Sequence, residues 1–392
     1  MTYKKQLKIF IIAGEPSGDV LGGKLIAALK QYSKKQKVQM SFLGIGGSKM
    51  QDQGLESIFS ISELSLMGFA EIVPHIPRLL KRINQTADQI IEWRPDIVIT
   101  IDAPDFCFRV IKKLYKNNNV LAAKIKKVHL IAPSVWAYRP GRAKKIAGIF
   151  DLLLAILPFE PPYFEKYGLK TVFIGHPITE QENQSLKNSN FRQKYNIKDN
   201  QMLLCLTPGS RVGEIKRILP PMIGAINILS KKYNNITVAI PTINKTHDLI
   251  AANLDQLQVR AVLVKEKDKI SLFNSADFAL AKSGTNSLEL AMARLPMIIT
   301  YKANIFTYLL IKIMAKVKFA NLINLILNRE VIPELLQFKC NAVHLASKLE
   351  ELISNPQIKK DQIQHSVQVL KMLGMDAKEK PSQKAAKAIL KG

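Results

Sequence analysis

Two carboxylates and a hydroxyl follow the first apolar run of the chain in a turn of small residues. Residues 13–19 read AGEPSGD, after a strand-like run at 8–13 and before a helical pattern. Ligands of α/β sheets bind at the carboxyl ends of strands, and a helix N-terminus attracts anions. Glu15, Ser17 and Asp19 could therefore hold a ligand, or Asp19 could simply cap the helix. The spacing is not GxGxxG, so a dinucleotide fingerprint is absent here.

A second acidic pair ends another apolar run, at 96–101, where the chain continues IDAPDF. A carboxylate at a strand end can take the proton of a sugar hydroxyl while a new bond forms. Asp102 is therefore the candidate general base. Asp105 falls near the start of the next helix, where capping is the simpler interpretation.

Two turns in the second half combine small residues with hydroxyls and a cation, at 208–211 (PGSR) and 283–285 (SGT). Backbone N–H groups, a guanidinium and a helix N-terminus suit a diphosphate, although Arg211 could also be an ordinary surface residue. Glu289, one turn into the following helix, is placed to reach ribose hydroxyls. The diphosphate candidates are Gly209, Ser210, Arg211, Ser283, Gly284 and Thr285.

Histidine and cysteine usage gives little sign of metal or disulfide chemistry. His176 stands alone in a Gly-His-Pro turn, where a structural role is common, and no partner stands at metal-ligand spacing. We therefore expect no metal. The three cysteines include no CxxC pair, which favours a reduced, cytoplasmic protein over a disulfide scaffold.

Short apolar runs alternate with helical patterns, which is typical of doubly wound parallel sheets. The polar stretch 179–200 separates two such series. Two open α/β domains in tandem would place a ligand cleft between their strand ends. The expected strands are 8–13, 38–44, 96–101, 127–131, 152–157, 171–174, 202–207, 236–240, 261–264, 278–281 and 297–300.

The net charge of +26, from 57 basic and 31 acidic residues, favours anionic partners such as phosphates or an acidic membrane. Part of this excess could reflect a lysine-rich genome. Nucleic acid is disfavoured as a partner, because only 7% of the residues are aromatic and no binding-module motif is present.

Two segments carry unusual apolar character. Residues 303–327 are interrupted by lysines, so they cannot supply the ~20 apolar residues of a bilayer span. They predict instead a buried or interfacial amphipathic helix at 306–317. Residues 66–77, with Leu66, Met67 and Phe69, are either local core or a patch that meets lipid or acyl chains.

Nine segments together resemble the lipid-A-disaccharide synthase family, glycosyltransferases of the GT-B type, over nearly the whole chain. Two departures concern loop shape: Tyr138 replaces a usual tryptophan, and Asn321 and Ile323 replace a commoner Ser-x-Pro. The matching segments are AGEPSGD (13–19), LMGFAEIV (66–73), IDAPDF (101–106), PSVWAYRPGR (133–142), LPFE (157–160), IGHP (174–177), PGSR with Glu214 after it (208–214), SGTNSLE (283–289) and NLILNREVIPELLQ (324–337).

The resemblance implies a GT-B-like α/β fold, with two doubly wound Rossmann-like domains facing across a cleft. Residues 1–178 would form the acceptor and membrane-facing domain, and 179–338 the UDP-sugar domain. The helical segment 339–392 would return to the N-terminal domain, or to that of a partner in a swapped homodimer.

The implied reaction is an inverting transfer without metal or cofactor. It moves 2,3-diacylglucosamine from its UDP derivative to 2,3-diacylglucosamine 1-phosphate (lipid X), giving lipid A disaccharide 1-phosphate and UDP. The enzyme would act on the cytoplasmic face of the anionic inner membrane, as a peripheral protein.

The resemblance also implies roles for single residues, at the positions where this sequence matches a motif of the family. Asp102 would be the base, and Asn324 and Arg329 would join the UDP-binding set. Leu66, Met67 and Phe69 would contact membrane or acyl chains. The acceptor side of the cleft would include Glu15, Ser17, Asp19, Asp105 and His176.

The alternative within enzymes is another GT-B protein that uses a UDP-sugar, such as an epimerase or a cell-wall glycosyltransferase. Such a protein would share the UDP turns but should lack the 66–77 segment and IDAPDF. A dinucleotide oxidoreductase is disfavoured by the missing GxGxxG.

Overall fold

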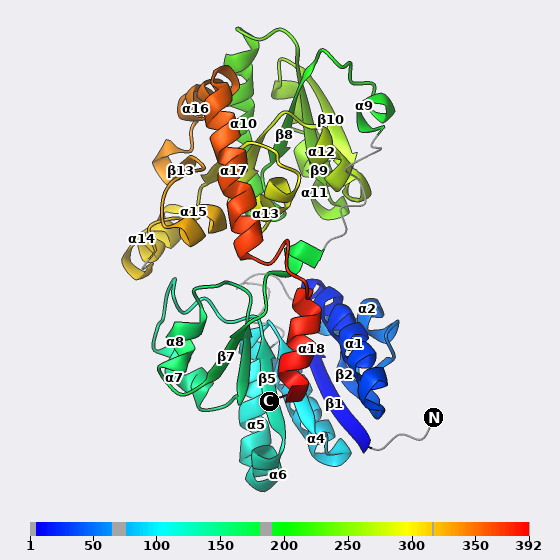
Figure 1. Cartoon of the computed structure of the whole chain (residues 1–392). Helices are drawn as coiled ribbons and strands as arrows, with labels where there is room; N and C mark the ends of the chain where they lie inside the picture. Colours follow the sequence, from blue (N-terminus) through cyan, green and yellow to red (C-terminus); the bar gives the residue numbers. More distant parts are fainter. Residues whose placement is uncertain (1–4, 65–75, 181–189, 316, 392) are drawn as a thin grey trace. The chain divides into compact units, whose positions relative to one another are not determined.

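The computed structural model of the chain describes residues 5–64, 76–180, 190–315 and 317–391. Two compact units account for the fold (Figure 1). The N-terminal unit comprises Met1–Glu180 together with Asp376–Gly392, and the C-terminal unit comprises Gln181–Met375. Each unit is built on one parallel sheet, so the predicted α/β class with two doubly wound domains is confirmed.

The N-terminal sheet has the strand order β3-β2-β1-β4-β5-β6-β7. The order reverses between β1 and β4, and this switch point is where open α/β sheets bind ligands. The strands are β1 (Lys5–Ala13), β2 (Val38–Ile45), β3 (Leu55–Ser57), β4 (Ile97–Ile101), β5 (Lys126–Leu130), β6 (Leu152–Ala155) and β7 (Lys170–Phe173).

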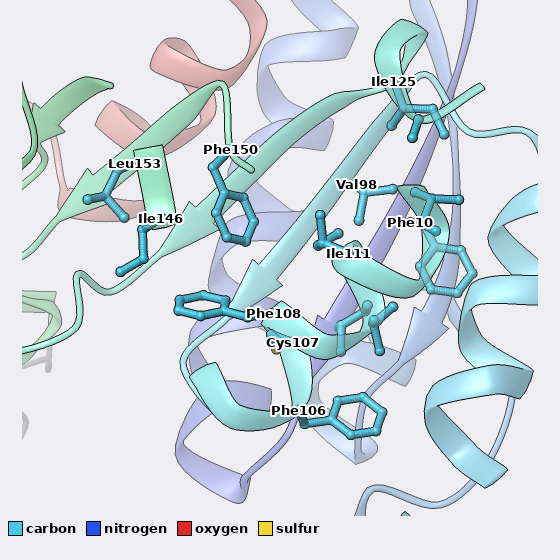
Figure 2. Packing of buried hydrophobic residues seen from close by; sticks show 14 of the residues in the cluster. Phe10, Val98, Phe106, Cys107, Phe108, Ile111, Ile125, Ile146, Phe150 and Leu153 are labelled. Atoms are coloured by element: carbon cyan, nitrogen blue, oxygen red, sulfur yellow. The ribbon is translucent and has the colours of Figure 1, made fainter. Parts of the chain in front are cut away.

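Helices cover both faces of this sheet, which explains why its central strands are apolar on both sides. Phe10 and Ile12 of β1 belong to the core on one face, and Ile9 and Ile11 belong to the core on the other. Figure 2 shows the first core, where Phe10 gathers with side chains of β4 and α5. The helices are α1 (Pro16–Gln36), α2 (Ser48–Gln51), η1 (Ile61–Glu63), α4 (Ile76–Trp93), α5 (Pro104–Asn117), α6 (Asn119–Lys124), α7 (Arg142–Ala147), α8 (Pro161–Glu165), η3 (Pro177–Glu180) and α18 (Pro381–Lys391).

The C-terminal sheet has the strand order β10-β9-β8-β11-β12-β13 and its own switch point between β8 and β11. Its strands are β8 (Met202–Thr207), β9 (Ile236–Thr242), β10 (Arg260–Lys265), β11 (Phe278–Lys282), β12 (Met297–Tyr301) and β13 (Glu334–Leu336). Its helices are α9 (Phe191–Lys194), α10 (Val212–Ser230), α11 (Asn244–Ala251), η4 (Leu254–Gln256), η5 (Glu266–Asp268), α12 (Lys269–Ser275), α13 (Asn286–Met292), α14 (Ile305–Met314), α15 (Leu322–Leu327), η6 (Gln337–Lys339), α16 (Ala342–Ser354) and α17 (Pro356–Met372).

The segment 339–392 is not a single returning element. Helix α16 packs on α10 and α17 packs on α13, both within the C-terminal unit. Only α18 packs on α1 of the N-terminal unit, where Ile389 joins the core beside Leu25. The expectation that all the helices after residue 338 return to the first domain is therefore corrected to the last helix alone.

The apolar stretch predicted to hold an amphipathic helix at 306–317 forms α14, Ile305–Met314. Among the helices that the structure describes, none is both long enough and apolar enough to cross a membrane.

Candidate active site

In the N-terminal unit, the first two acidic turns of the sequence lie side by side. Ala13 at the end of β1 pairs with Ile101 at the end of β4. A Cβ atom at Gly14 would lie 2.5 Å from the Cβ of Ala103, so only glycine allows the two turns to approach this closely. This packing brings the exposed Glu15 and Ser17 to the same sheet edge as Asp102.

Asp102 occupies an unusual backbone conformation. Asp102 and Ala103 have φ angles of 50° and 42°, in the left-handed region that costs non-glycine residues energy and clusters at functional sites. The Asp102 N–H donates to the carbonyl of Leu130 at 3.0 Å, which fixes the turn to β5. Burial raises the pKa of the Asp102 carboxyl. This effect of burial is larger than the lowering effect of the hydrogen bond from the Ala103 N–H, so the pKa is raised overall. A raised pKa makes the carboxylate a stronger base.

Asp19 has a structural role in the fold, and its expected contact with the acceptor stays a prediction. Its carboxylate is buried and accepts three backbone N–H bonds, from Gly47 at 2.8 Å, Lys49 at 3.1 Å and Met50 at 3.0 Å. These donors lie at the start of α2, so Asp19 caps that helix rather than its own. Its oxygens are therefore occupied within the fold.

Asp105 and His176 also have partners within the fold, and their assignment to the acceptor side stays a prediction. The Asp105 carboxylate is exposed and pairs with Arg142 of α7 at 3.0 Å, and it does not cap α5. His176 is buried, and its Nδ1 accepts the N–H of Ile178 at 3.1 Å. Burial lowers the pKa of His176 to about 4, so the ring is neutral at pH 7 and shapes its own turn.

Glu160 is a buried acid to which the sequence analysis assigned no role. It is 1% exposed. One oxygen accepts the indole N–H of Trp136 at 3.2 Å, and the other accepts the N–H groups of Ile156 and Leu157 at 3.1 and 3.0 Å. Glu160 therefore joins the loop 133–142 to the end of β6. An acid that closes the apolar segment LPFE is the sequence signal that could have identified it.

Replacing Glu160 with glutamine should remove one component of the pH dependence of folding. Burial raises the pKa of Glu160 to about 7, above the ordinary 4.5. At pH values between these two pKa values, Glu160 keeps its proton in the folded chain and loses it in the unfolded chain. The contribution of Glu160 to stability therefore falls as pH rises. Relative to E160Q, wild-type stability should fall by on the order of 3 kcal/mol between pH 4.5 and 8. Urea unfolding at several pH values measures this, and parallel profiles would contradict it.

In the C-terminal unit, a cavity of about 330 Å³ opens at the carboxyl ends of β8, β9 and β11. Its walls come from turns far apart in the sequence, which the parallel sheet brings together. The lining residues are Thr207, Gly209, Ser210, Pro241, Thr242, Ile243, Thr246, Glu266, Lys269, Lys282, Gly284, Thr285, Asn286 and Glu289.

The two predicted diphosphate turns meet in this cavity. The side-chain amide of Asn286 donates to the hydroxyl of Thr207 at 2.9 Å and ties the turn after β11 to the end of β8. Gly209 has a φ of 119°, and a Cβ there would lie 2.6 Å from an oxygen of the buried Glu214. Glycine is therefore required where the chain passes Glu214.

Two lysines supply the positive charge of the cavity, and sequence analysis missed both. Lys269 Nζ lies 2.6 Å from Glu289 Oε2, and Lys282 Nζ lies 3.1 Å from Glu214 Oε1. Ammonium groups on a cavity wall suit a diphosphate. In the described part of the chain, no three His, Cys, Asp or Glu side chains gather in a way that could hold a metal ion.

The predicted UDP residues divide into two groups. Gly209, Ser210, Gly284, Thr285 and Glu289 line the cavity. Arg211, Ser283, Asn324 and Arg329 do not line it. The Arg211 side chain is 72% exposed, the Ser283 hydroxyl donates to the carbonyl of Ala320 at 2.7 Å, and Arg329 is exposed beyond the end of α15.

The structure places Asn324 inside the fold, where its side chain is hydrogen-bonded, and its expected role in donor binding stays a prediction. Its side chain is completely buried. The amide nitrogen donates to the carbonyl of Ile332 at 2.7 Å and to Glu334 at 2.8 Å. The amide oxygen accepts the N–H groups of Val331 and Ile332 at 2.9 and 3.0 Å. Asn324 therefore holds the loop 328–333 against α15.

The proposed membrane residues Leu66, Met67 and Phe69 lie outside the described residues. Their assignment stays a prediction from the sequence.

Comparison with known proteins places the chain in a family. The family described as lipid-A-disaccharide synthetase matches residues 9–389. The lipid-A-disaccharide synthase of Rickettsia bellii is 45% identical over 384 residues, covering 97% of this chain and 98% of that protein. The enzyme of Rhodospirillum centenum is 41% identical over 387 residues, covering 98% and 94%.

Among solved structures, the UDP-GlcNAc 2-epimerase of Neisseria meningitidis, bound to UDP-GlcNAc, has a TM-score of 0.61 and 14% identity. The likeness covers 99% of this chain and 98% of that one. At this identity it shows the fold alone, which is the GT-B type. The family match and the two relatives, which span nearly the whole chain, decide its affiliation: the chain belongs to the lipid-A-disaccharide synthase family.

Proposed function

We propose that the chain catalyses the transfer of 2,3-diacylglucosamine from its UDP derivative to 2,3-diacylglucosamine 1-phosphate, with release of UDP. The observation that carries this proposal is Asp102, a carboxylate with a raised pKa, which follows β4 in a left-handed turn at the switch point of the N-terminal sheet. Family membership gives the reaction, and the geometry supplies a base suited to it.

In this mechanism a sugar hydroxyl of the acceptor attacks the anomeric carbon of the donor. A carbon–oxygen bond forms on the face opposite UDP while the bond from that carbon to the diphosphate oxygen breaks, so the configuration inverts. The hydroxyl proton passes to Asp102, and the electron pair of the broken bond leaves on UDP. Donors that neutralise the departing diphosphate lower the barrier. Lys269, Lys282 and the N–H groups of the turns at 209 and 284 are suited to this.

The donor cavity and the base lie on different units, so the reaction requires both. Glu15 and Ser17 are exposed at the sheet edge that carries Asp102, and they are candidates for hydrogen bonds to acceptor hydroxyls.

The lipid substrates place the reaction at a membrane, and we assign it to the cytoplasmic face of the inner membrane. The charge of +26 supports attraction to anionic lipid. A homodimer stays a prediction that light scattering tests.

The assay that tests the function contains purified chain, UDP-diacylglucosamine and the acceptor in detergent micelles. Stoichiometric UDP and disaccharide are expected. A parallel reaction contains UDP-GlcNAc as the only sugar substrate. Its conversion to a 2-epimer, with no disaccharide formed in the first assay, would instead support the alternative function of a UDP-sugar epimerase.

Replacing Glu289 with glutamine should raise the KM for the UDP donor about tenfold, the cost of roughly one hydrogen bond to a charged group. Glu289 lines the cavity and fixes Lys269, so the variant loses both a ribose partner and the position of that cation. Steady-state UDP release gives kcat and KM. Glu351→Gln is the matched control, because it breaks a Lys–Glu pair of the same 2.6 Å length on α16, outside the cavity. An unchanged donor KM in E289Q would contradict the assignment.

A further inference from the structure

Helix α14 presents large apolar side chains to solvent on one face. Phe306 and Ile313 are 83% and 82% exposed, and Ile305 and Leu309 are 45% and 49% exposed. At roughly 100° per residue, these four positions fall within an arc of about 100° on the helix. Phe338, 72% exposed, lies beside the helix next to this face, where its ring meets that of Tyr308 with centroids 5.8 Å apart. We call the four exposed residues of the arc the α14 patch.

The base of α14 is firmly held. Gln337 is buried and pairs through its amide with both backbone groups of Ala303, at 3.1 Å each. Arg217 donates to the carbonyl of Lys302 at 3.1 Å, and the side chain of Asn304 accepts the N–H of Thr307 at 2.7 Å as a helix cap. Figure 1 shows α14 at the margin of the C-terminal unit. Within the described residues, the fold thus positions the helix and leaves its apolar face exposed, although burial of such a face is what normally stabilises a helix.

The stretch of sequence that carries α14 is basic. Residues 290–329 contain six lysines and arginines and no aspartate or glutamate. Lys312 stands at the edge of the apolar arc, and Lys318 and Lys339 are exposed. A second copy of this chain would bring an equally basic face against the first, which repulsion disfavours. An anionic lipid surface complements both the charge and the apolar face.

We propose that α14 is a membrane-docking helix, which lies in the interface of an anionic bilayer with Phe306 and Ile313 in its apolar layer and the lysines at the headgroups. The helix would anchor the C-terminal unit at the membrane where the lipid donor resides. The inference deepens the proposed function and rests on it only for the lipid nature of the substrates.

The test compares Phe306→Ser/Ile313→Ser with the wild type in sedimentation with phosphatidylglycerol-containing vesicles. Loss of two apolar side chains from the interface should reduce partitioning roughly tenfold or more. Binding should fall with rising salt. Turnover in detergent micelles should stay unchanged, because neither residue lines the donor cavity.

Val120→Ser/Ile228→Ser is the control, since it removes two exposed apolar side chains from other helices. Leu66→Ser/Met67→Ser/Phe69→Ser in parallel tests the separate contact proposed for the N-terminal unit.

Vesicle binding of the α14 variant equal to that of the wild type would overturn the proposal. A change from dimer to monomer with vesicle binding retained would overturn it in favour of a second copy as the occupant. Thermal melts of each variant check whether the substitutions at exposed positions leave the fold intact. The wild type could bind vesicles but make no disaccharide in micelles, while Phe306→Ser/Ile313→Ser loses vesicle binding. That result would contradict the proposed function and support the docking helix.

Discussion

Asp102→Asn should lower turnover by about 10²–10⁴-fold, the usual contribution of a general base, while the donor KM stays near that of the wild type. Asparagine has the same shape as aspartate and tolerates the left-handed conformation that position 102 adopts at a φ of 50°. The loss therefore reports the missing proton acceptor rather than a rearranged turn. Single-turnover UDP release measures the chemical step directly.

The pH dependence provides a second readout of the same residue. A base must be ionised to act, so the wild-type rate should rise with pH through the raised pKa of Asp102 and then level off. The residual rate of D102N should lack this acid limb. Asp105→Asn is the matched control, because it changes a carboxylate that is exposed and paired with Arg142. Loss of turnover in D105N alone would transfer the role of base to Asp105.

The central strands could be predicted from the sequence because they are buried on both faces. Each is a short apolar run between helical patterns, and all the expected strands occur in the structure. The short edge strands β3 and β13 were missed. Each is three residues long and includes a glutamate, so neither forms a recognisable apolar run. They form only because the neighbouring strand offers unpaired backbone groups.

The candidate site was predictable where function depends on position along a strand. Asp102 and the turns at 209 and 284 follow apolar strands, and parallel strands collect such turns at one edge. The roles of Asp19 and Lys282 depend on partners elsewhere in the chain. Asp19 reaches N–H groups 28 to 31 residues away, and Lys282 at the end of β11 pairs with Glu214 of α10. No local pattern distinguishes a carboxylate that caps a distant helix from one that faces a ligand.

Asn324→Ala should lower the free energy of unfolding of the C-terminal unit by about 3–5 kcal/mol, because it leaves buried polar partners unsatisfied. The side chain makes four hydrogen bonds while fully buried, and alanine satisfies none of them. Glu334 also loses a partner while it still accepts the N–H groups of Ala320 and Asn321. We therefore expect the loop 328–333 to loosen and the unit to melt at a lower temperature.

Tryptophan fluorescence and circular dichroism report on different parts of the chain. Both tryptophans, Trp93 and Trp136, belong to the N-terminal unit, whereas far-UV circular dichroism reports helices of both units. Circular dichroism melts should therefore show the loss in N324A more strongly than tryptophan fluorescence does. Asn227→Ala is the control, since that partly exposed asparagine makes two hydrogen bonds in the same unit and should cost about 1 kcal/mol.

Donor binding separates the structural role of Asn324 from the role that its motif implied. Well below the melting temperature, N324A should keep a near-normal donor KM, because Asn324 does not line the cavity, whereas E289Q should not. An N324A variant of wild-type stability with a raised donor KM would show that Asn324 binds the donor directly. Lower stability with a near-normal donor KM would mean that this motif acts through the fold: a buried amide fixes the loop 328–333, and ligand contact is left to the turns at the strand ends.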